Sequence, residues 1–200
     1  MKLLYTGNSP YARRVRVALR EAGLMRQVEE VDIAPREEHL DELLAHGPGG
    51  KVPVLVTDTG QSLCESLVIC TYLNTLSAGK LYPKAHVELE AALRIEGLAS
   101  VLLDSLFVRS RENRRDDAEK SQAVIDLEAD RAARCYDALE ALGSGLKAPA
   151  HNGLYSVVVA LGYANWRHAG DCWRANRPGL SDCYDELMQR ESLASTAPVF

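Results

Sequence analysis

The chain has 200 residues, of which 46% are hydrophobic and 26% charged, and its formal net charge at pH 7 is -5. This length suffices for one large domain or two small ones with a sizeable core. The negative balance gives no overall basic surface for nucleic acid, and no apolar run reaches the ~20 residues of a membrane span. We therefore expect neither nucleic-acid nor membrane partners.

Cysteine usage and the first residues indicate the compartment. The five cysteines are scattered and form no CxxC pair, which suits reduced thiols better than a disulfide framework or a metal cluster. Residues 1–5 lack the long apolar core and small-residue cleavage site of a signal peptide. We expect a cytoplasmic protein that binds no metal.

The beginning of the chain predicts a strand, a helix and a second strand. Residues 2–5 form a short apolar run that ends at a Gly-Asn turn. Ser9 and Pro10 then open a helix, with Ser as the N-cap and Pro in the first turn. Apolar residues follow at helical spacing until Gly23, and residues 27–33 alternate as a strand does. The order indicates a βαβ unit.

The next segments complete a small α/β domain. Residues 36–45 are charged with apolar leucines at helical spacing, and a Gly-Pro-Gly-Gly loop follows. Residues 54–57 and 62–63, joined by a short polar turn, predict an antiparallel hairpin. Residues 65–77 predict a helix. The expected order is therefore βαβαββα.

Strand-like alternation disappears after residue 79, and long helical patterns replace it. The apolar spacing predicts helices at residues 86–113, 117–142, 154–167 and 178–190, the third of them buried on most sides. We therefore divide the chain into an α/β domain at 1–78, a linker at 79–85 and an all-α domain at 86–200.

Four arginines lie close together at the end of the first of these helices: Arg109, Arg111, Arg114 and Arg115. Acidic residues follow at once, and no aromatic residues lie between the arginines. We interpret the group as a solvated helix terminus whose charges suit the helix dipole, rather than as a nucleic-acid patch.

The most informative stretch is residues 49–55, completed by Glu65 and Ser66. Pro53 has no N–H for a sheet partner and belongs at a strand's first residue. The backbone of Val52 can then pair with something other than a strand. Glu65 and Ser66 open a helix whose first N–H groups can receive a carboxylate. The pattern indicates a peptide-binding site, and an ordinary loop with a turn proline and a helix cap is the alternative.

Several motifs, taken in order, resemble one family. They are Ser-Pro-Tyr-Ala-Arg-Arg-Val-Arg at 9–16, Gly-Lys-Val-Pro-Val-Leu at 50–55, Glu65-Ser66, Leu-Gly-Tyr at 161–163, and the segment from Arg177-Pro178 to Ala197-Pro198. Over essentially its whole length the chain resembles the cytosolic glutathione transferases, in particular bacterial-like members of the Ser/Cys type.

The resemblance implies a thioredoxin-like N-terminal domain followed by an all-helical domain, usually as a homodimer. It also implies that the Val52–Pro53 bond is cis and that glutathione is the co-substrate. Within a glutathione site, the Val52 backbone would receive the cysteinyl part by strand addition. Glu65 would bind the glutamyl ammonium, Ser66 the glutamyl carboxylate, and Lys51 the glycyl carboxylate. His39 is a weaker candidate at the glycyl end, and an exposed helix residue is the alternative for it.

The thiol must ionise to react, and a free cysteine thiol has a pKa of about 8.5. Ser9 aligns with the activating Ser or Cys of the Ser/Cys-type classes, and its hydroxyl can donate a hydrogen bond to the thiolate at a helix start. A plain N-cap is the alternative role. Tyr5 is a rival, because other classes use a Tyr near the end of the first strand.

The resemblance also places an electrophile pocket between the domains. Its expected lining is Tyr11, Leu103, Phe107 and Val108. The leading prediction is therefore an enzyme that activates glutathione for attack on a small electrophile. A glutathione-dependent isomerase or dehalogenase and a non-catalytic protein-binding module are the alternatives.

One departure from the family pattern lies in the helical domain. The usual Ser/Thr-x-x-Asp capping box is replaced by His151-Asn152-Gly153-Leu154, so the reciprocal acidic residue is missing. We expect Asn152 to serve as the cap, and the loss of a cap costs about 1 kcal/mol.

Overall fold

The computed structural model describes residues 1–33 and 39–198, and its contacts divide the chain into two compact units. The first comprises Met1–Lys84 together with the described residues after Arg190, and the second comprises Ala85–Arg190. The helix expected at 36–45 lies partly outside the described residues. Its described part is α2, Leu40–His46.

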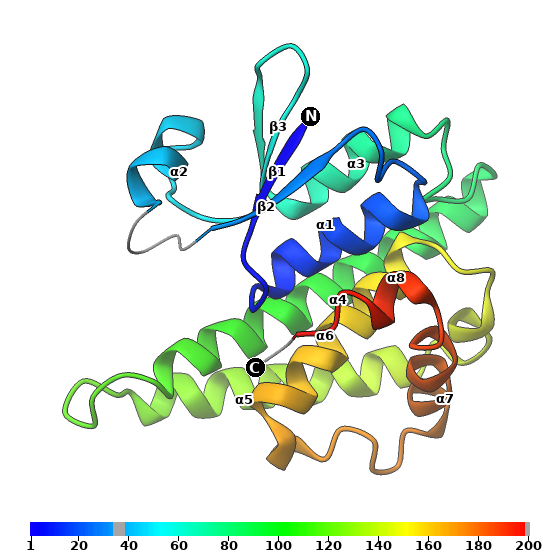
Figure 1. Ribbon diagram of the computed structural model, residues 1–200. Helices are drawn as coiled ribbons and strands as arrows, with labels where there is room; N and C mark the ends of the chain where they lie inside the picture. The colour runs from blue at the N-terminus through cyan, green and yellow to red at the C-terminus, as the bar shows by residue number, and fades with distance from the viewer. Residues whose placement is uncertain (34–38, 199–200) are drawn as a thin grey trace. The chain divides into compact units, whose positions relative to one another are not determined.

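The first unit contains a four-stranded mixed sheet in the order β2-β1-β3-β4 (Figure 1). Its strands are β1 Lys2–Tyr5, β2 Glu29–Asp32, β3 Val54–Val56 and β4 Ser62–Cys64. β1 pairs with β2 in parallel, while the β1–β3 and β3–β4 pairs are antiparallel. The βαβ unit and the hairpin are thus confirmed, and the unit has the thioredoxin-like βαβαββα arrangement.

Helices cover both faces of this sheet because successive strand residues point to opposite sides. Leu3 packs in a buried cluster with residues of α1, Pro10–Glu21, and α3, Ser66–Leu76. Leu4 faces the other way and packs with Leu43 of α2.

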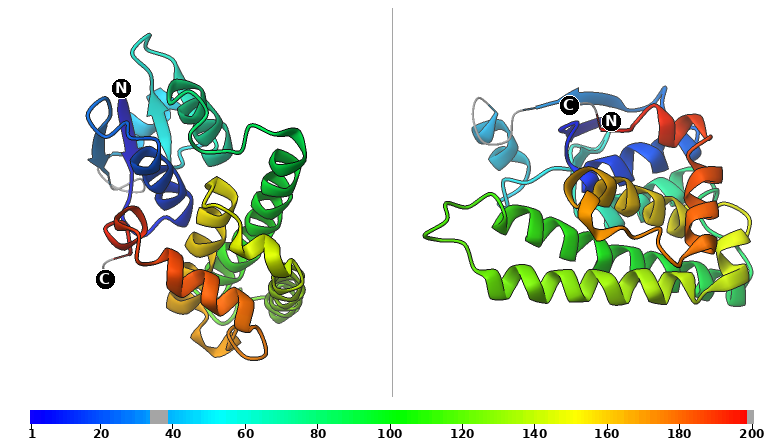
Figure 2. Two further views of the ribbon diagram at one scale, coloured as in Figure 1. Left: turned by 90° about the vertical axis from the view of Figure 1, so that its right-hand side faces the viewer. Right: turned by 90° about the horizontal axis from the view of Figure 1, so that it is seen from below.

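The second unit is entirely helical, and α6 is buried on nearly all sides, as its apolar sequence predicts. The helices are α4 His86–Glu112, α5 Gln122–Glu140, α6 Asn152–Arg167 and α7 Pro178–Leu187, with 3-10 segments at Gly143–Lys147 and Ala169–Asp171. α4 packs against both α5 and α6, and Figure 2 shows α4 and α5 running side by side. Within the described residues, no helix is both long and apolar enough to cross a membrane.

The end of the chain differs from the prediction. The predicted helix at 178–190 ends at Leu187, and a separate short helix, α8, spans Glu191–Ala194. α8 belongs to the first unit, because Arg13 donates to the Leu193 carbonyl at 3.0 Å and Ser192 donates to Glu21. The all-α unit therefore ends before α8 instead of reaching residue 200.

Arg109 also differs from the prediction of a solvated helix end. Its side chain is buried and donates to both carboxylate oxygens of Asp171 at 2.7 and 2.6 Å and to His168 Nδ1 at 3.1 Å. Tyr136 donates to the same carboxylate. The other three arginines of the group are exposed. Arg109 is thus a structural residue of the helical unit.

Candidate functional site

Ser9 lies immediately before α1 and caps it. Its Oγ accepts a hydrogen bond from the Ala12 N–H at 3.2 Å, and Pro10 occupies the first helical position. The cap uses an oxygen lone pair, so the hydroxyl proton of the half-buried Ser9 can still be donated to another group. Accepting one hydrogen bond also strengthens the hydroxyl as a donor. Capping and donation are therefore compatible.

The Val52–Pro53 peptide bond is cis, which confirms the expectation from the resemblance. Pro53 and Val54 are buried, Val52 is half-buried and Lys51 is exposed. The ladder between β1 and β3 ends at the Leu4–Val54 pair, so Val52 lies outside it. Its backbone is thus positioned beyond the sheet pairing, as strand addition by a peptide requires.

Glu65 and Ser66 form the start of α3. Glu65 is the N-cap residue but makes no side-chain cap, and its backbone has a φ of 69°. Such a conformation is strained for a residue other than glycine, and strained residues cluster at functional sites. Ser66 is only 3% exposed, and its Oγ accepts a hydrogen bond from Arg14 Nη1 at 3.2 Å.

The strand register brings these three stretches to one end of the sheet. Leu4 pairs with Val54, and Val54 pairs with Cys64. The turn after β1 leads to Ser9, the segment before β3 contains Val52 and Pro53, and Glu65 follows β4. Because these strands are antiparallel neighbours, the start of α1, the cis proline and the start of α3 share that end.

The loop before Lys51 is tied to the same end of the sheet. A Cβ placed on Gly47 would lie 2.9 Å from Cys64 Sγ, so a larger residue here would require the Cys64 side chain to shift. Gly50 has a φ of 53° and donates to the Gly47 carbonyl at 3.2 Å. The Gly-Pro-Gly-Gly loop is thus an ordered turn beside Cys64, the residue that precedes Glu65.

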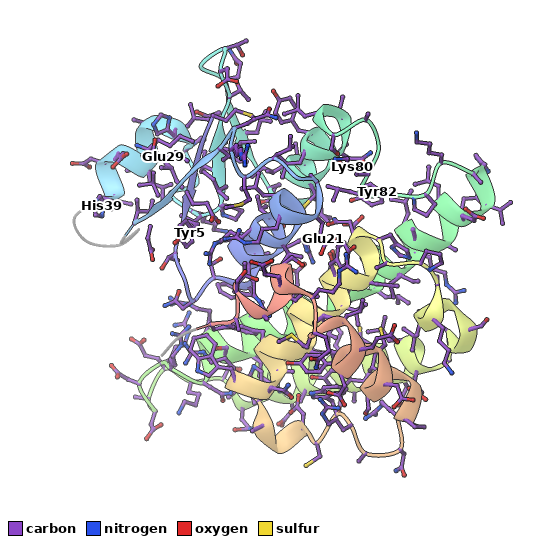
Figure 3. The ribbon with its side chains drawn as sticks, turned by 45° about the vertical axis from the view of Figure 1, so that its right-hand side comes forward. Tyr5, Glu21, Glu29, His39, Lys80 and Tyr82 are labelled. Atoms are coloured by element: carbon purple, nitrogen blue, oxygen red, sulfur yellow. The ribbon has the colours of Figure 1, made fainter. Side chains whose placement is uncertain are left out.

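Tyr5, labelled in Figure 3, lies at the end of β1 and its ring is covered by an arginine. The guanidinium carbon of Arg16 lies 4.2 Å from the ring centroid. Arg16 and Arg20 both pair with Glu30 of β2. Burial alone would raise the pKa of Glu30, but hydrogen bonds and charge from Arg20 and Arg16 lower it overall. The Tyr5 ring is therefore part of an ion-paired cluster that extends to β2.

The predicted electrophile residues differ in exposure. Leu103 is fully buried, Tyr11 and Phe107 are half-buried, and Val108 is 41% exposed. Their grouping into one pocket stays a prediction. His39 is half-buried and lies just before α2.

Arg14, which donates to Ser66, is not among the residues predicted from the sequence for this end of the sheet. The apolar stripe of α1 at Val15, Ala18 and Leu19, extended back by one helical turn, includes position 14. A charged residue on the buried stripe was therefore the signal.

The helix start at α6 also differs from the prediction. His151, not Asn152, is the N-cap, and its Nδ1 accepts from the Gly153 N–H at 3.1 Å. Asn152 is buried and donates to Glu96 of α4 at 2.6 Å. The cap is thus retained by a histidine, and the asparagine serves contact between helices.

Comparison with known proteins identifies the class of this fold and site. The sequence profile of the glutathione S-transferase N-terminal domain matches residues 8–76. An uncharacterized GST-like protein, YibF of Escherichia coli K12, is 30% identical over 99% of this chain and 98% of its own. The chain belongs to the glutathione S-transferase family.

Solved structures agree with this assignment. A glutathione transferase family member from Pseudomonas fluorescens Pf-5, with bound glutathione, is 30% identical with a TM-score of 0.92, covering 100% of this chain and 99% of that one. A glutathione S-transferase from Methylobacillus flagellatus KT, also with glutathione bound, is 30% identical with a TM-score of 0.90 and 99% coverage of both chains. Among the described residues, no group of three His, Cys, Asp or Glu side chains is arranged to hold a metal.

Proposed function

We propose that this protein is a glutathione transferase that activates the glutathione thiolate for attack on a small hydrophobic electrophile. The observation that carries the proposal is the convergence of Ser9, Val52–Pro53 and Glu65–Ser66 at one end of the sheet. Relatives with the same fold and 30% identity hold glutathione.

Each part of glutathione has a partner of matching chemistry in this proposal. The Val52 backbone pairs with the cysteinyl residue beside Pro53, as a strand pairs with a sheet edge. Glu65 attracts the glutamyl ammonium, and Ser66 with the first N–H groups of α3 binds the glutamyl carboxylate. The exposed Lys51 attracts the glycyl carboxylate.

Ser9 supplies the chemistry at the thiol. Its hydroxyl donates a hydrogen bond to the thiolate, and the N-terminus of α1 adds a favourable potential. A hydrogen bond to a charged acceptor contributes about 1.5–3 kcal/mol, which lowers the thiol pKa by about one to two units. The thiolate sulfur then forms a bond to the electrophilic carbon, and with an aryl halide the carbon–halogen bond breaks and halide leaves. Of the residues predicted to line the electrophile site, Tyr11, Phe107 and Val108 have accessible surface for such a contact, whereas Leu103 is fully buried.

Replacement of Ser9 tests this mechanism, and Ser121 provides a matched control. Ser121 caps α5 in the same way, with Oγ accepting from the Val124 N–H at 3.4 Å. Ser9→Ala and Ser121→Ala should each lose a cap, worth about 1 kcal/mol of stability. Only Ser9→Ala should raise the pKa of bound glutathione, read from thiolate absorbance, and slow turnover of a model aryl halide about 10- to 100-fold.

Two results would reject the Ser9 assignment. Undiminished turnover in Ser9→Ala would do so, as would an equal loss in Ser121→Ala. Tyr5→Phe completes the comparison. Because the ring of Tyr5 is held by Arg16, we expect this variant to retain turnover.

The runner-up is a non-catalytic, transferase-like binding module, and a glutathione-dependent isomerase or dehalogenase is a variant of the enzyme proposal. A helical domain that had lost its capping box would favour the module. His151 provides that cap, so the altered box no longer supports the module. Retention on immobilised glutathione together with a thiolate absorbance would favour the enzyme.

We also propose a cytoplasmic homodimer. Several apolar side chains are exposed on α3, namely Leu67, Val68 and Leu76, and on α4, namely Val87, Leu93 and Val101; others are Leu40 and Leu44 on α2 and Leu127 on α5. Exposed apolar surface of this kind marks protein–protein contact. Sedimentation should give the dimer mass, and Val68→Lys should shift it towards the monomer if α3 forms the contact.

A further inference from the structure

Two arginines at one end of the helical unit have no carboxylate partner within the part of the chain that the structure describes. Arg114 lies just after the last turn of α4, and Arg167 is the last residue of α6. The neighbouring Arg109 and Arg115 each form an ion pair, with Asp171 and with a glutamate of α4. Among the described residues, no carboxylate therefore balances the charges of Arg114 and Arg167.

The helices that carry these arginines run in the same direction and end together. Towards the beginning of α6, Asn152 donates to Glu96 of α4 at 2.6 Å. Just after the end of α6, the Nε2 atom of His168 lies 2.9 Å from the Leu106 carbonyl, in the last part of α4. The last turns of the two helices are therefore neighbours, as the residues that follow them also are.

The surroundings of Arg167 hold its guanidinium in place and favour an anion beside it. The guanidinium carbon lies 3.3 Å from the ring centroid of Trp166. Burial lowers the pKa of Arg167, the Tyr163 side chain opposes this shift, and the nearby charge of Arg114 lowers the pKa further. Arg167 is only half-buried, so part of its side chain is accessible to a ligand. An anion there would reduce the repulsion between the two arginines.

Arg114 extends back along α4 towards Phe107. Its Nε donates to the Ser110 carbonyl at 3.1 Å, and this contact directs the side chain towards the preceding turn. Phe107 lies seven positions before Arg114, which is about two helical turns, so the two residues belong to the same side of α4. Phe107 is half-buried and is one of the residues predicted for the electrophile site. The two arginines therefore continue the surface on which we expect the electrophile.

We propose that Arg114 and Arg167 bind the carboxylate of an anionic aromatic electrophile. The inference rests on the proposed function and names the substrate class of that site. A guanidinium can donate two parallel hydrogen bonds to one carboxylate. The half-buried rings of Phe107 and Trp166 offer apolar surface to an aromatic ring. The carboxylate itself is not changed in the reaction, and its binding positions the reacting carbon.

Two substrates that differ in charge test the proposal. They are 4-chloro-3,5-dinitrobenzoate and the neutral 4-chloro-3,5-dinitrobenzamide. In both, the thiolate sulfur forms a bond to the carbon that carries chlorine, and chloride leaves. With saturating glutathione, Arg167→Met should lower kcat/KM for the benzoate about 10-fold, mainly through KM, because a hydrogen bond between charged groups is lost. Arg114→Met should lower it about 3-fold, because exposed ion pairs are screened by solvent. Both variants should turn over the benzamide nearly as wild type.

Arg94 provides a matched control on the same helix. It is exposed and lies about 30 Å before Arg114 along the helix axis. Arg94→Met removes the same charge and should turn over both substrates as wild type. Arg167→Lys keeps the charge and should recover part of the preference for the benzoate. In the wild type this preference should fall as the salt concentration rises, and in Arg167→Met it should depend on salt less.

The outcomes separate this inference from the proposed function. An equal loss for both substrates in Arg167→Met would indicate a structural role and overturn the inference, as would an unchanged preference for the benzoate. A change in the KM for glutathione instead would assign the arginines to a glutathione carboxylate and also overturn it.

Turnover of neither substrate by the wild type would reject the proposed function, and calorimetry with unreactive ligands then decides the inference. The ligands are 3,5-dinitrobenzoate and 3,5-dinitrobenzamide, which lack the leaving group. Tighter binding of the benzoate that is lost in Arg167→Met would support the anion site. Equal binding of the two ligands by the wild type would reject the anion site as well.

Discussion

Two of the buried arginines, Arg14 in the first unit and Arg109 in the helical unit, have opposite surroundings. Arg109 in the helical unit donates to His168 and to both oxygens of Asp171. Arg14 in the first unit donates to Ser66 alone, and two of its nitrogens have no hydrogen-bond partner within the described residues. A buried charge whose donors are matched stabilises the fold, whereas buried donors without a partner cost free energy.

The largest expected effect comes from breaking the matched network. Arg109→Met should lower the free energy of unfolding of the helical unit by about 3–5 kcal/mol, because Asp171 and His168 lose their buried partner. Chemical denaturation followed by tryptophan fluorescence measures this, since Trp166 and Trp173 both lie in that unit. An equal loss in ligand-free Arg14→Met would erase the contrast between the two arginines.

The sequence predicts much of the fold, but it does not predict the different hydrogen-bond partners of Arg14 and Arg109. Residues 2–5, the hairpin and the apolar stripes predict their elements because local patterns determine them. The partners of Arg14 and Arg109 come from residues 52 and 62 positions away, Ser66 and Asp171. Spacing within one helix carries no information about such distant pairs.

The residues of the candidate site and the helix ends also include some that the sequence predicts and some that it does not. Ser9, Pro53 and Ser66 were predictable because each carries a local backbone signal in a familiar order. His151 was not predicted as a cap, since histidine is not among the residues that prefer this position. α8 was missed because four residues, Glu191–Ala194, are too few for a helical pattern.

A smaller effect tests how tightly the helical unit is packed. A Cβ on Gly153 would lie 2.5 Å from the Ala92 backbone oxygen, whereas one on Gly97 of α4 would meet nothing within 4 Å. Gly153→Ala should therefore destabilise the protein by about 1–3 kcal/mol. Gly97→Ala should stabilise it by about 0.5–1 kcal/mol, because it favours the helix. Thermal unfolding measures both, and a stabilised Gly153→Ala would contradict the close approach.

The last prediction concerns stability at acidic pH. Burial lowers the pKa of His151 and the pKa of His168 below the ordinary value of 6.5. At His168, the charges of Arg109 and Arg167 lower the pKa further. The Leu106 carbonyl and Asp171 raise it, but by less than burial lowers it. Both rings accept hydrogen bonds as neutral groups, so the unfolded chain binds more protons than the folded one. The contribution of the two neutral histidines to the free energy of unfolding is fully present above pH ~6.5. It is lost as the pH falls below that value, by up to about 1.4 kcal/mol per histidine per pH unit.

His151→Asn separates the two histidines, because asparagine caps a helix and does not titrate. This variant should lose stability less steeply than wild type between pH 6.5 and pH 5, as about half of the proton linkage is removed. Urea titrations at several pH values give the slope. An unchanged slope would show that the His151 cap does not respond to protonation.

The attachment of α8 has a consequence for the order in which the protein can be completed during synthesis. The Leu193 carbonyl that receives Arg13, and the Ser192 hydroxyl that reaches Glu21 (labelled in Figure 3), are translated only after the entire helical unit. While the ribosome makes residues 85–190, the first unit lacks its final segment. A nascent chain paused at residue 190 should therefore be more sensitive to protease in α1 than the released protein.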